Sequence, residues 1–173
     1  MKGSLPNFEA GTEAVCQNVA FDTRWRRLTK AANTQFDDGS HNQAQRLYAQ
    51  AIAEAETLFT KALQTGENCR AIPPMMIVSA CNMARNYEAI PAPHSALSVF
   101  HQSLEFLVAV LQNGTAPPPL KAEIVRNIPQ LTCEIAARKN MNIYDDLLIE
   151  ALLRLAKSKV EAFLKQQMSV CAN

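Results

Sequence analysis

The stretch that decides the fold, residues 28–52, reads LTKAANTQFDDGSHNQAQRLYAQAI. Its first half places Leu28, Ala32 and Phe36 four residues apart, a spacing that puts them on one face of a helix. Gly39 follows, and glycine readily adopts the left-handed backbone that ends a helix. A second helical stripe then carries Ala44, Leu47, Tyr48, Ala51 and Ile52. Because only a few residues separate the two stripes, we predict two antiparallel helices packed as a hairpin.

The same pattern extends outward along the rest of the chain. Apolar residues recur at spacings of three and four, interrupted by breakers that contain glycine and proline. The apolar spacing and the breakers together predict three helix pairs, over residues 22–65, 72–112 and 119–167. Pro129 falls inside the fifth helix and is expected to kink it. We therefore predict an all-α fold of six main helices in a single domain, residues 22–173, preceded by a flexible or partly helical segment, residues 1–21.

A second copy of the motif, residues 80–104, reads ACNMARNYEAIPAPHSALSVFHQSL. Its alanines at 84 and 96 match the spacing of those at 32 and 44, and small side chains let two helix backbones approach closely. The two motifs resemble the tetratricopeptide repeat family, which implies an antiparallel helix-hairpin solenoid. They depart from it in lying 52 residues apart instead of about 34, with Pro91 in place of the turn glycine. The third pair matches only in periodicity and is either a divergent repeat or a capping hairpin.

The resemblance implies a binding groove lined by the first helix of each pair. The chain would then be a protein–protein interaction module, an adaptor, chaperone or assembly factor that binds a peptide or partner helix. Asn33 and Asn82 fall where a carboxylate-binding subgroup of the family has its amides, whereas Thr29 stands in place of a lysine. The alternative is that these side chains belong to solvated helix faces. The candidate groove residues are Arg26, Lys30, Asn33, Asn82, Arg85, Lys121, Arg126 and Asn127.

Charge favours no polyanionic partner. The chain has 17 basic and 16 acidic residues, a formal net charge of +1, so nothing draws it as a whole to nucleic acid or anionic lipid. One local cluster, Arg24, Arg26, Arg27 and Lys30 beside Trp25, is nevertheless basic. It supports an alternative function, a regulatory helical domain that binds a small ligand or nucleic acid, although such charges are typical of a solvated helix face. A homodimer held together by the helices is a third alternative.

No group of residues indicates catalysis, a metal site or a cofactor. The five cysteines have no paired spacing, and no acidic residue lies directly beside any of the three histidines. We interpret His41 and His94 as exposed residues near the starts of second helices, and Cys81 as a buried thiol and not a nucleophile. Without a signal-peptide core or a membrane span, the sequence predicts a non-enzymatic cytoplasmic protein with no membrane partner.

Overall fold

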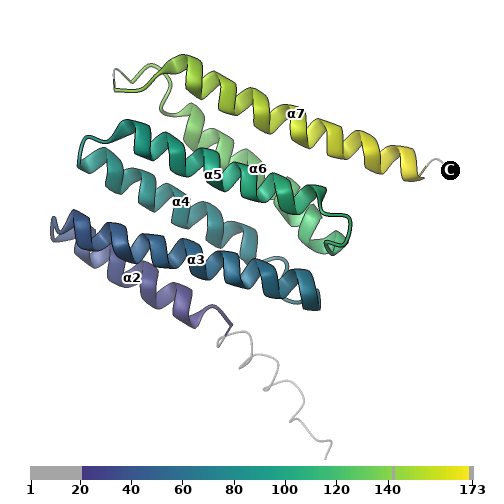
Figure 1. The fold of residues 1–173 in the computed structure, drawn as a ribbon, viewed down its shortest axis with the longest axis horizontal. Helices are drawn as coiled ribbons and strands as arrows, with labels where there is room; N and C mark the ends of the chain where they lie inside the picture. Colours follow the sequence, from purple (N-terminus) through teal and green to yellow (C-terminus); the bar gives the residue numbers. More distant parts are fainter. Residues whose placement is uncertain (1–20, 142, 172–173) are drawn as a thin grey trace, which may run out of the picture.

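A computed structural model describes residues 21–141 and 143–171, which form a stack of helices (Figure 1). The helices, labelled as in Figure 1, are α2 (Thr23–Asp37), α3 (His41–Thr65), α4 (Ile72–Ala89), α5 (Pro93–Gln112), α6 (Pro118–Ala136) and α7 (Asp146–Cys171). No β-strand occurs in the described ranges, so the predicted all-α fold with six main helices is confirmed. Residues 1–20, nearly all of the predicted N-terminal segment, lie outside the described residues.

The helix boundaries follow the glycines and prolines. Gly39 (φ 74°) and Gly66 (φ 72°) adopt the left-handed conformation after α2 and α3, and the Gly66 amide donates to the carbonyl of Ala62 at 2.8 Å. Helices α4, α5 and α6 each have proline in their first two positions, where the missing amide costs no helical hydrogen bond. Pro129 lies inside α6, which continues beyond it to Ala136.

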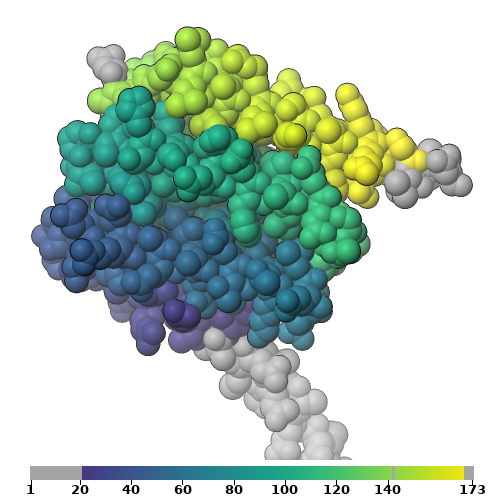
Figure 2. Space-filling view, in the orientation of Figure 1, coloured from purple at the N-terminus to yellow at the C-terminus, as the bar shows by residue number. Residues whose placement is uncertain are grey.

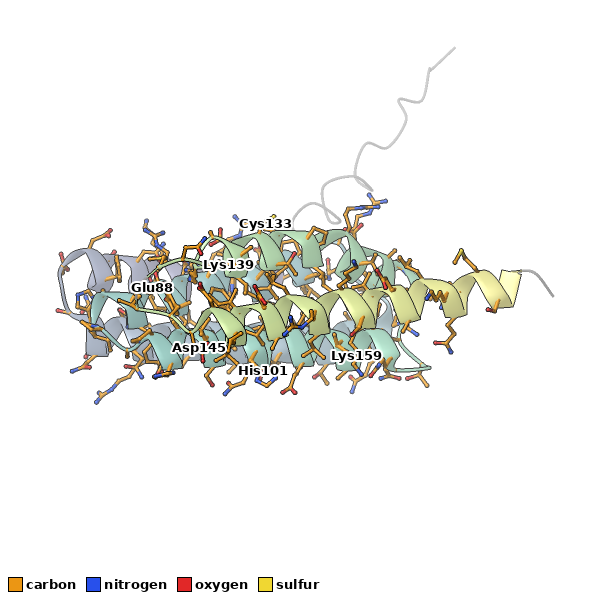
Figure 3. The ribbon with its side chains drawn as sticks, turned by 90° about the horizontal axis from the view of Figure 1, so that it is seen from above. Glu88, His101, Cys133, Lys139, Asp145 and Lys159 are labelled. Atoms are coloured by element: carbon orange, nitrogen blue, oxygen red, sulfur yellow. The ribbon has the colours of Figure 1, made fainter. Side chains whose placement is uncertain are left out.

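Helix α7 begins at Asp146, whereas the apolar spacing in the second half of the pair predicted over residues 119–167 indicates a helix from about Ile143. The physical reason is Asp145, whose Oδ1 accepts hydrogen bonds from the backbone amides of Leu147 (2.9 Å) and Leu148 (3.4 Å). A carboxylate in this position satisfies amides that have no partner in the first helical turn. Figure 3 shows Asp145 at this end of α7. The apolar Ile143 fits the helical periodicity but lies ahead of the cap, which is why the predicted start was wrong.

The hairpins α2–α3, α4–α5 and α6–α7 are stacked in chain order (Figure 1). Helix α3 packs on α4, α6 packs on both α4 and α5, and α7 packs on α5 and α6. This order puts α4 in the middle of the stack, where Ile72, Ile77 and Ala80 have no exposed surface. Helices α2 and α7 lie at its two ends.

Small side chains lie between the packed helices of the first two hairpins. The four alanines shared by the two sequence motifs have no exposed surface: Ala32, Ala44, Ala84 and Ala96. Tyr48 and Met83 pack with the first two in a small cluster between the first and second hairpins. The main core runs from α3 to α7 and contains the fully buried rings of Phe59 and Phe100. The predicted stripe of small residues is therefore part of the interior.

Candidate functional site

A polar pocket of about 160 Å³ opens between α2 and α4, the first helices of two consecutive hairpins. It contains three of the eight candidate groove residues, Asn33 from α2 and Asn82 and Arg85 from α4. The complete lining is Asn33, Phe36, Asp37, Tyr48, Asn82 and Arg85. Two amides and one guanidinium therefore lie around one opening, although Asn33 precedes Asn82 by 49 positions in the sequence.

Tyr48 holds the Asn33 side chain in place. The Tyr48 ring is 3 % exposed, and its hydroxyl donates a hydrogen bond to Asn33 Oδ1 at 2.8 Å. Burial raises the pKa of the Tyr48 hydroxyl, so this group remains a donor at neutral pH. The bond occupies one acceptor position of the Asn33 amide and leaves its NH₂ group to donate elsewhere. The pocket thus offers a fixed amide donor.

Arg85 and Asp37 give the pocket one charge of each sign. The Arg85 guanidinium is exposed and its central carbon lies 6.0 Å from the centroid of the Phe36 ring. Such a contact with an aromatic face orients a guanidinium without consuming its hydrogen-bond donors. Asp37, at the last position of α2, contributes the opposing carboxylate. An anionic group entering the pocket would therefore be attracted to the Arg85 side and repelled from the Asp37 side.

The other five candidate residues do not line this pocket. Lys30 is exposed on α2, and Arg26 Nε pairs with Asp22 Oδ2 at 2.6 Å. On α6, Arg126 pairs with Glu123, while the Asn127 amide donates to the Glu123 carbonyl at 2.7 Å. The Lys121 ammonium lies 5.8 Å from the ring centroid of Phe163. A role for these five residues in partner binding stays a prediction.

The basic cluster at the start of α2 is partly paired within the chain. Arg24 Nη1 lies 2.9 Å from Glu54 Oε2 of α3, in addition to the pair between Arg26 and Asp22. The Trp25 indole, which would stack on a base in a nucleic-acid site, donates instead to Ser79 Oγ of α4 at 2.8 Å. These contacts give the nucleic-acid alternative no support.

His41 is half-buried, so its interpretation as an exposed residue was wrong. Its ring packs edge-on against Phe36 with centroids 5.3 Å apart, and its Nδ1 lies 3.3 Å from Oδ1 of Asn86. Asn86, which has no exposed surface, also donates through Nδ2 to the His41 carbonyl at 3.1 Å. The contact joins the start of α3 to α4, 45 positions away, so no local signal in the sequence could reveal it.

Cys81 is half-buried, and burial, followed by the nearby charge of Glu134, raises the pKa of its thiol to about 12. A thiol with such a pKa is almost entirely protonated at neutral pH and is a poor nucleophile.

Within residues 21–141 and 143–171, no group of three or more His, Cys, Asp or Glu side chains is arranged to hold a metal ion. Among the described helices, none is long and apolar enough to cross a membrane.

Two further hollows have less polar linings. One, of about 310 Å³, lies between α3 and α5, with Ile52, Met83 and Phe106 among its lining residues. The other, of about 600 Å³, lies between the C-terminal half of α7 and the start of α6, with Phe163 and Leu164 in its wall. Neither brings together a cation and two amides as the pocket between α2 and α4 does.

Fold and pocket together define an all-helical protein of stacked hairpins that carries a small polar pocket between the first helices of two of them. Residues 23–168 match the model of a family described as "Protein of unknown function (DUF2753)". The chain belongs to this family. No curated protein and no solved structure gives a significant match.

Proposed function

We propose that this protein is a non-enzymatic interaction module that binds a segment of a partner protein along the first helices of its hairpins. The observation that carries the proposal is the pocket between α2 and α4, where Asn33, Asn82 and Arg85 lie together. Amide and guanidinium groups on a rigid helical scaffold suit recognition of a polypeptide, because they pair with main-chain and carboxylate groups without any chemical step. An adaptor, a chaperone or an assembly factor would use such a surface.

Each polar group has a defined task in this proposal. The NH₂ groups of Asn33 and Asn82 donate to main-chain carbonyls of the partner, which gives affinity that depends little on sequence. Arg85 accommodates a carboxylate, because its parallel N–H groups match the two carboxylate oxygens. Asp37 restricts that carboxylate to the Arg85 side of the pocket. A partner segment with one acidic group, or with its C-terminal carboxylate, fits this arrangement.

We also propose that the hairpin stack is a tetratricopeptide-like solenoid. Support comes from the consecutive packing of hairpins and from the buried alanines at matching positions of the first two. The 52-residue separation of the motifs has a concrete origin in the 25-residue helix α3 and the loop that follows it. The first helices nevertheless remain in contact, α2 with α4 and α4 with α6. The cytoplasmic location read from the sequence belongs to the same proposal.

A comparison of proteins co-purified by three tagged forms of the chain tests the proposed function. Wild type is compared with the double variant Asn33→Ala/Asn82→Ala and with Asn42→Ala, a matched control because Asn42 is exposed on α3 outside the pocket. We expect the double variant to lose its specific partner by roughly tenfold or more, since two donors to a partly desolvated segment are removed. Asn42→Ala should retain it. Unchanged recovery of every partner by the double variant would contradict the proposal.

A further inference from the structure

Helix α7 and the segment just before it carry the exposed apolar surface of the described residues. The large hydrophobic side chains that are exposed all belong to this part of the chain: Met141, Ile143, Leu147, Leu148, Leu164 and Met168. Helix α7 forms the end of the stack, and Figure 3 shows it lying over the other helices with no described element covering it. Apolar surface concentrated at one edge of a folded protein marks an interaction site more often than a solvated face.

The exposed residues of α7 form a stripe opposite its core side. The core side is marked by Ile149, Leu152 and Ala156, which are almost fully buried. The outer stripe follows the alternating spacing of four and three residues that keeps side chains on one face of a helix facing a second helix. Its members, all exposed, are Leu147, Ala151, Arg154, Ser158, Glu161, Lys165 and Met168. The stripe therefore has the geometry of a helix–helix seam.

This outer stripe is complementary to itself when a second α7 runs antiparallel to it. With the centre of the contact between residues 157 and 158, Leu147 of one copy lies opposite Met168 of the other. In the same register, Arg154 lies opposite Glu161. Glu150, which borders the stripe and pairs with Lys139 at 2.7 Å in its own chain, lies opposite Lys165. One register thus pairs apolar with apolar and opposite charges with each other, which is the requirement of a two-fold symmetric interface.

We propose that the outer stripe of α7 binds a second copy of this chain, with the two α7 helices antiparallel about a two-fold axis. The charges of the stripe identify the occupant, because Arg154 and Glu161 of one copy lie opposite Glu161 and Arg154 of the other, an arrangement that an unrelated partner has no reason to reproduce. Within one chain Arg154 and Glu161 make only long, exposed ion pairs, at 3.5 Å to Glu150 and 3.9 Å to Lys157. Such exposed pairs are weak, so both residues can exchange partners on association.

The shape of the molecule suits this arrangement. The C-terminal part of α7 projects beyond the other helices (Figures 1 and 2). In an antiparallel pair, the projecting end of one copy lies along the first turns of the partner's α7. It would cover Leu147, which is 74 % exposed in the single chain, with Met168, which is 64 % exposed. The interface leaves the pocket between α2 and α4 open, because that pocket lies in the first two hairpins.

Charge reversal provides a sharp test by multi-angle light scattering of the full chain over a concentration series. Wild type should have twice the mass of one chain. Arg154→Glu alone and Glu161→Arg alone each place like charges opposite one another, so each should weaken dimer formation roughly tenfold or more.

An equimolar mixture of the two variants restores both opposite-charge contacts and should form a heterodimer. A variant that merely unfolds cannot be rescued in this way. Arg46→Glu, an exposed change of the same size on α3, should leave the dimer intact.

Three results would overturn the proposal. A wild-type chain that stays monomeric at the highest concentration shows that a different protein, or solvent, covers the stripe. Dimeric single variants show that the interface lies elsewhere. Monomeric variants that fail to combine when mixed exclude the antiparallel register. Because the pocket between α2 and α4 takes no part in this test, its outcome is independent of the proposed function.

Discussion

Arg138, Glu88 and Tyr144 form a buried polar network that ties the segment between α6 and α7 to the end of α4. The Arg138 side chain is 7 % exposed; its Nε lies 2.6 Å from Glu88 Oε1, which also accepts a hydrogen bond from the Tyr144 hydroxyl. The guanidinium carbon lies 4.6 Å from the centroid of the Phe100 ring. Burial alone would lower the pKa of Arg138, but its hydrogen bond to Glu88 raises it, so the cation is retained inside the protein.

Removal of this cation should destabilise the protein markedly. We expect Arg138→Ala to lower the free energy of unfolding by about 3 kcal/mol, because it leaves the Glu88 carboxylate partly buried without its counter-ion. Lys157→Ala is the control: it breaks an ion pair with Glu161 whose two side chains are 78 % and 52 % exposed, and it should cost less than about 1 kcal/mol. Urea unfolding followed by circular dichroism measures both. Equal losses in the two variants would show that the network contributes nothing beyond an ordinary surface pair.

At the scale of helices, Asn86 connects α4 to the first residue of α3. Its side chain has no exposed surface and contacts both the ring and the carbonyl of His41. The carbonyl already belongs to the first turn of α3, so the amide fixes where that helix starts relative to α4. A buried side-chain amide whose oxygen and nitrogen both have hydrogen-bond partners contributes more to the free energy of unfolding than an amide that faces solvent.

We therefore expect Asn86→Ala to cost about 1–3 kcal/mol of the free energy of unfolding, since buried hydrogen bonds are lost and a small cavity remains. Asn82→Ala, one turn earlier on α4 and half-buried at the pocket, should change stability by no more than about 0.5 kcal/mol. Chemical unfolding of both variants measures whether Asn86 contributes more than Asn82 to the free energy of unfolding. A larger loss for Asn82→Ala than for Asn86→Ala would reverse these assignments.

The elements were largely predictable because their signals are local. Helical spacing, Gly39 and Gly66 after helices, and the prolines that open α4, α5 and α6 each act within a few residues. The start of α7 was misplaced for a related reason: Ile143 continues the apolar spacing, and only the structure shows that Asp145 caps the helix after it.

The candidate site was predictable only in part. Asn33, Asn82 and Arg85 were found because the repeated motif aligns α2 with α4, so a position on one helix indicates its counterpart on the other. The roles of Asp37 and Tyr48 in the pocket were missed. Asp37 is explained locally by the turn after the first helix, and Tyr48 by the interior of the hairpin. The pairing of Arg26 with Asp22 and of Arg126 with Glu123 depends on side-chain conformation, which periodicity does not encode.

At the scale of the whole molecule, the stacking order separates two surfaces. The pocket lies between α2 and α4 in the first two hairpins, whereas the outer stripe lies on α7 at the other end. Helix α4 lies between them and is the most enclosed element, with Met76, Ile77 and Ala84 nearly or fully buried. This separation would let the two proposed interactions, with a partner segment and with a second copy, occur at the same time.

The central claim, a partner segment held on the first helices, is tested most directly by site-specific photo-crosslinking in cells that produce the protein. A photo-reactive residue replaces Lys30, which is exposed on α2 one helical turn before Asn33, or His101, which is exposed on α5. We predict a specific adduct from position 30, none of the same mass from position 101, and loss of the adduct when Asn33→Ala/Asn82→Ala is added. The same adduct from both positions, or one that survives the double substitution, would contradict the account.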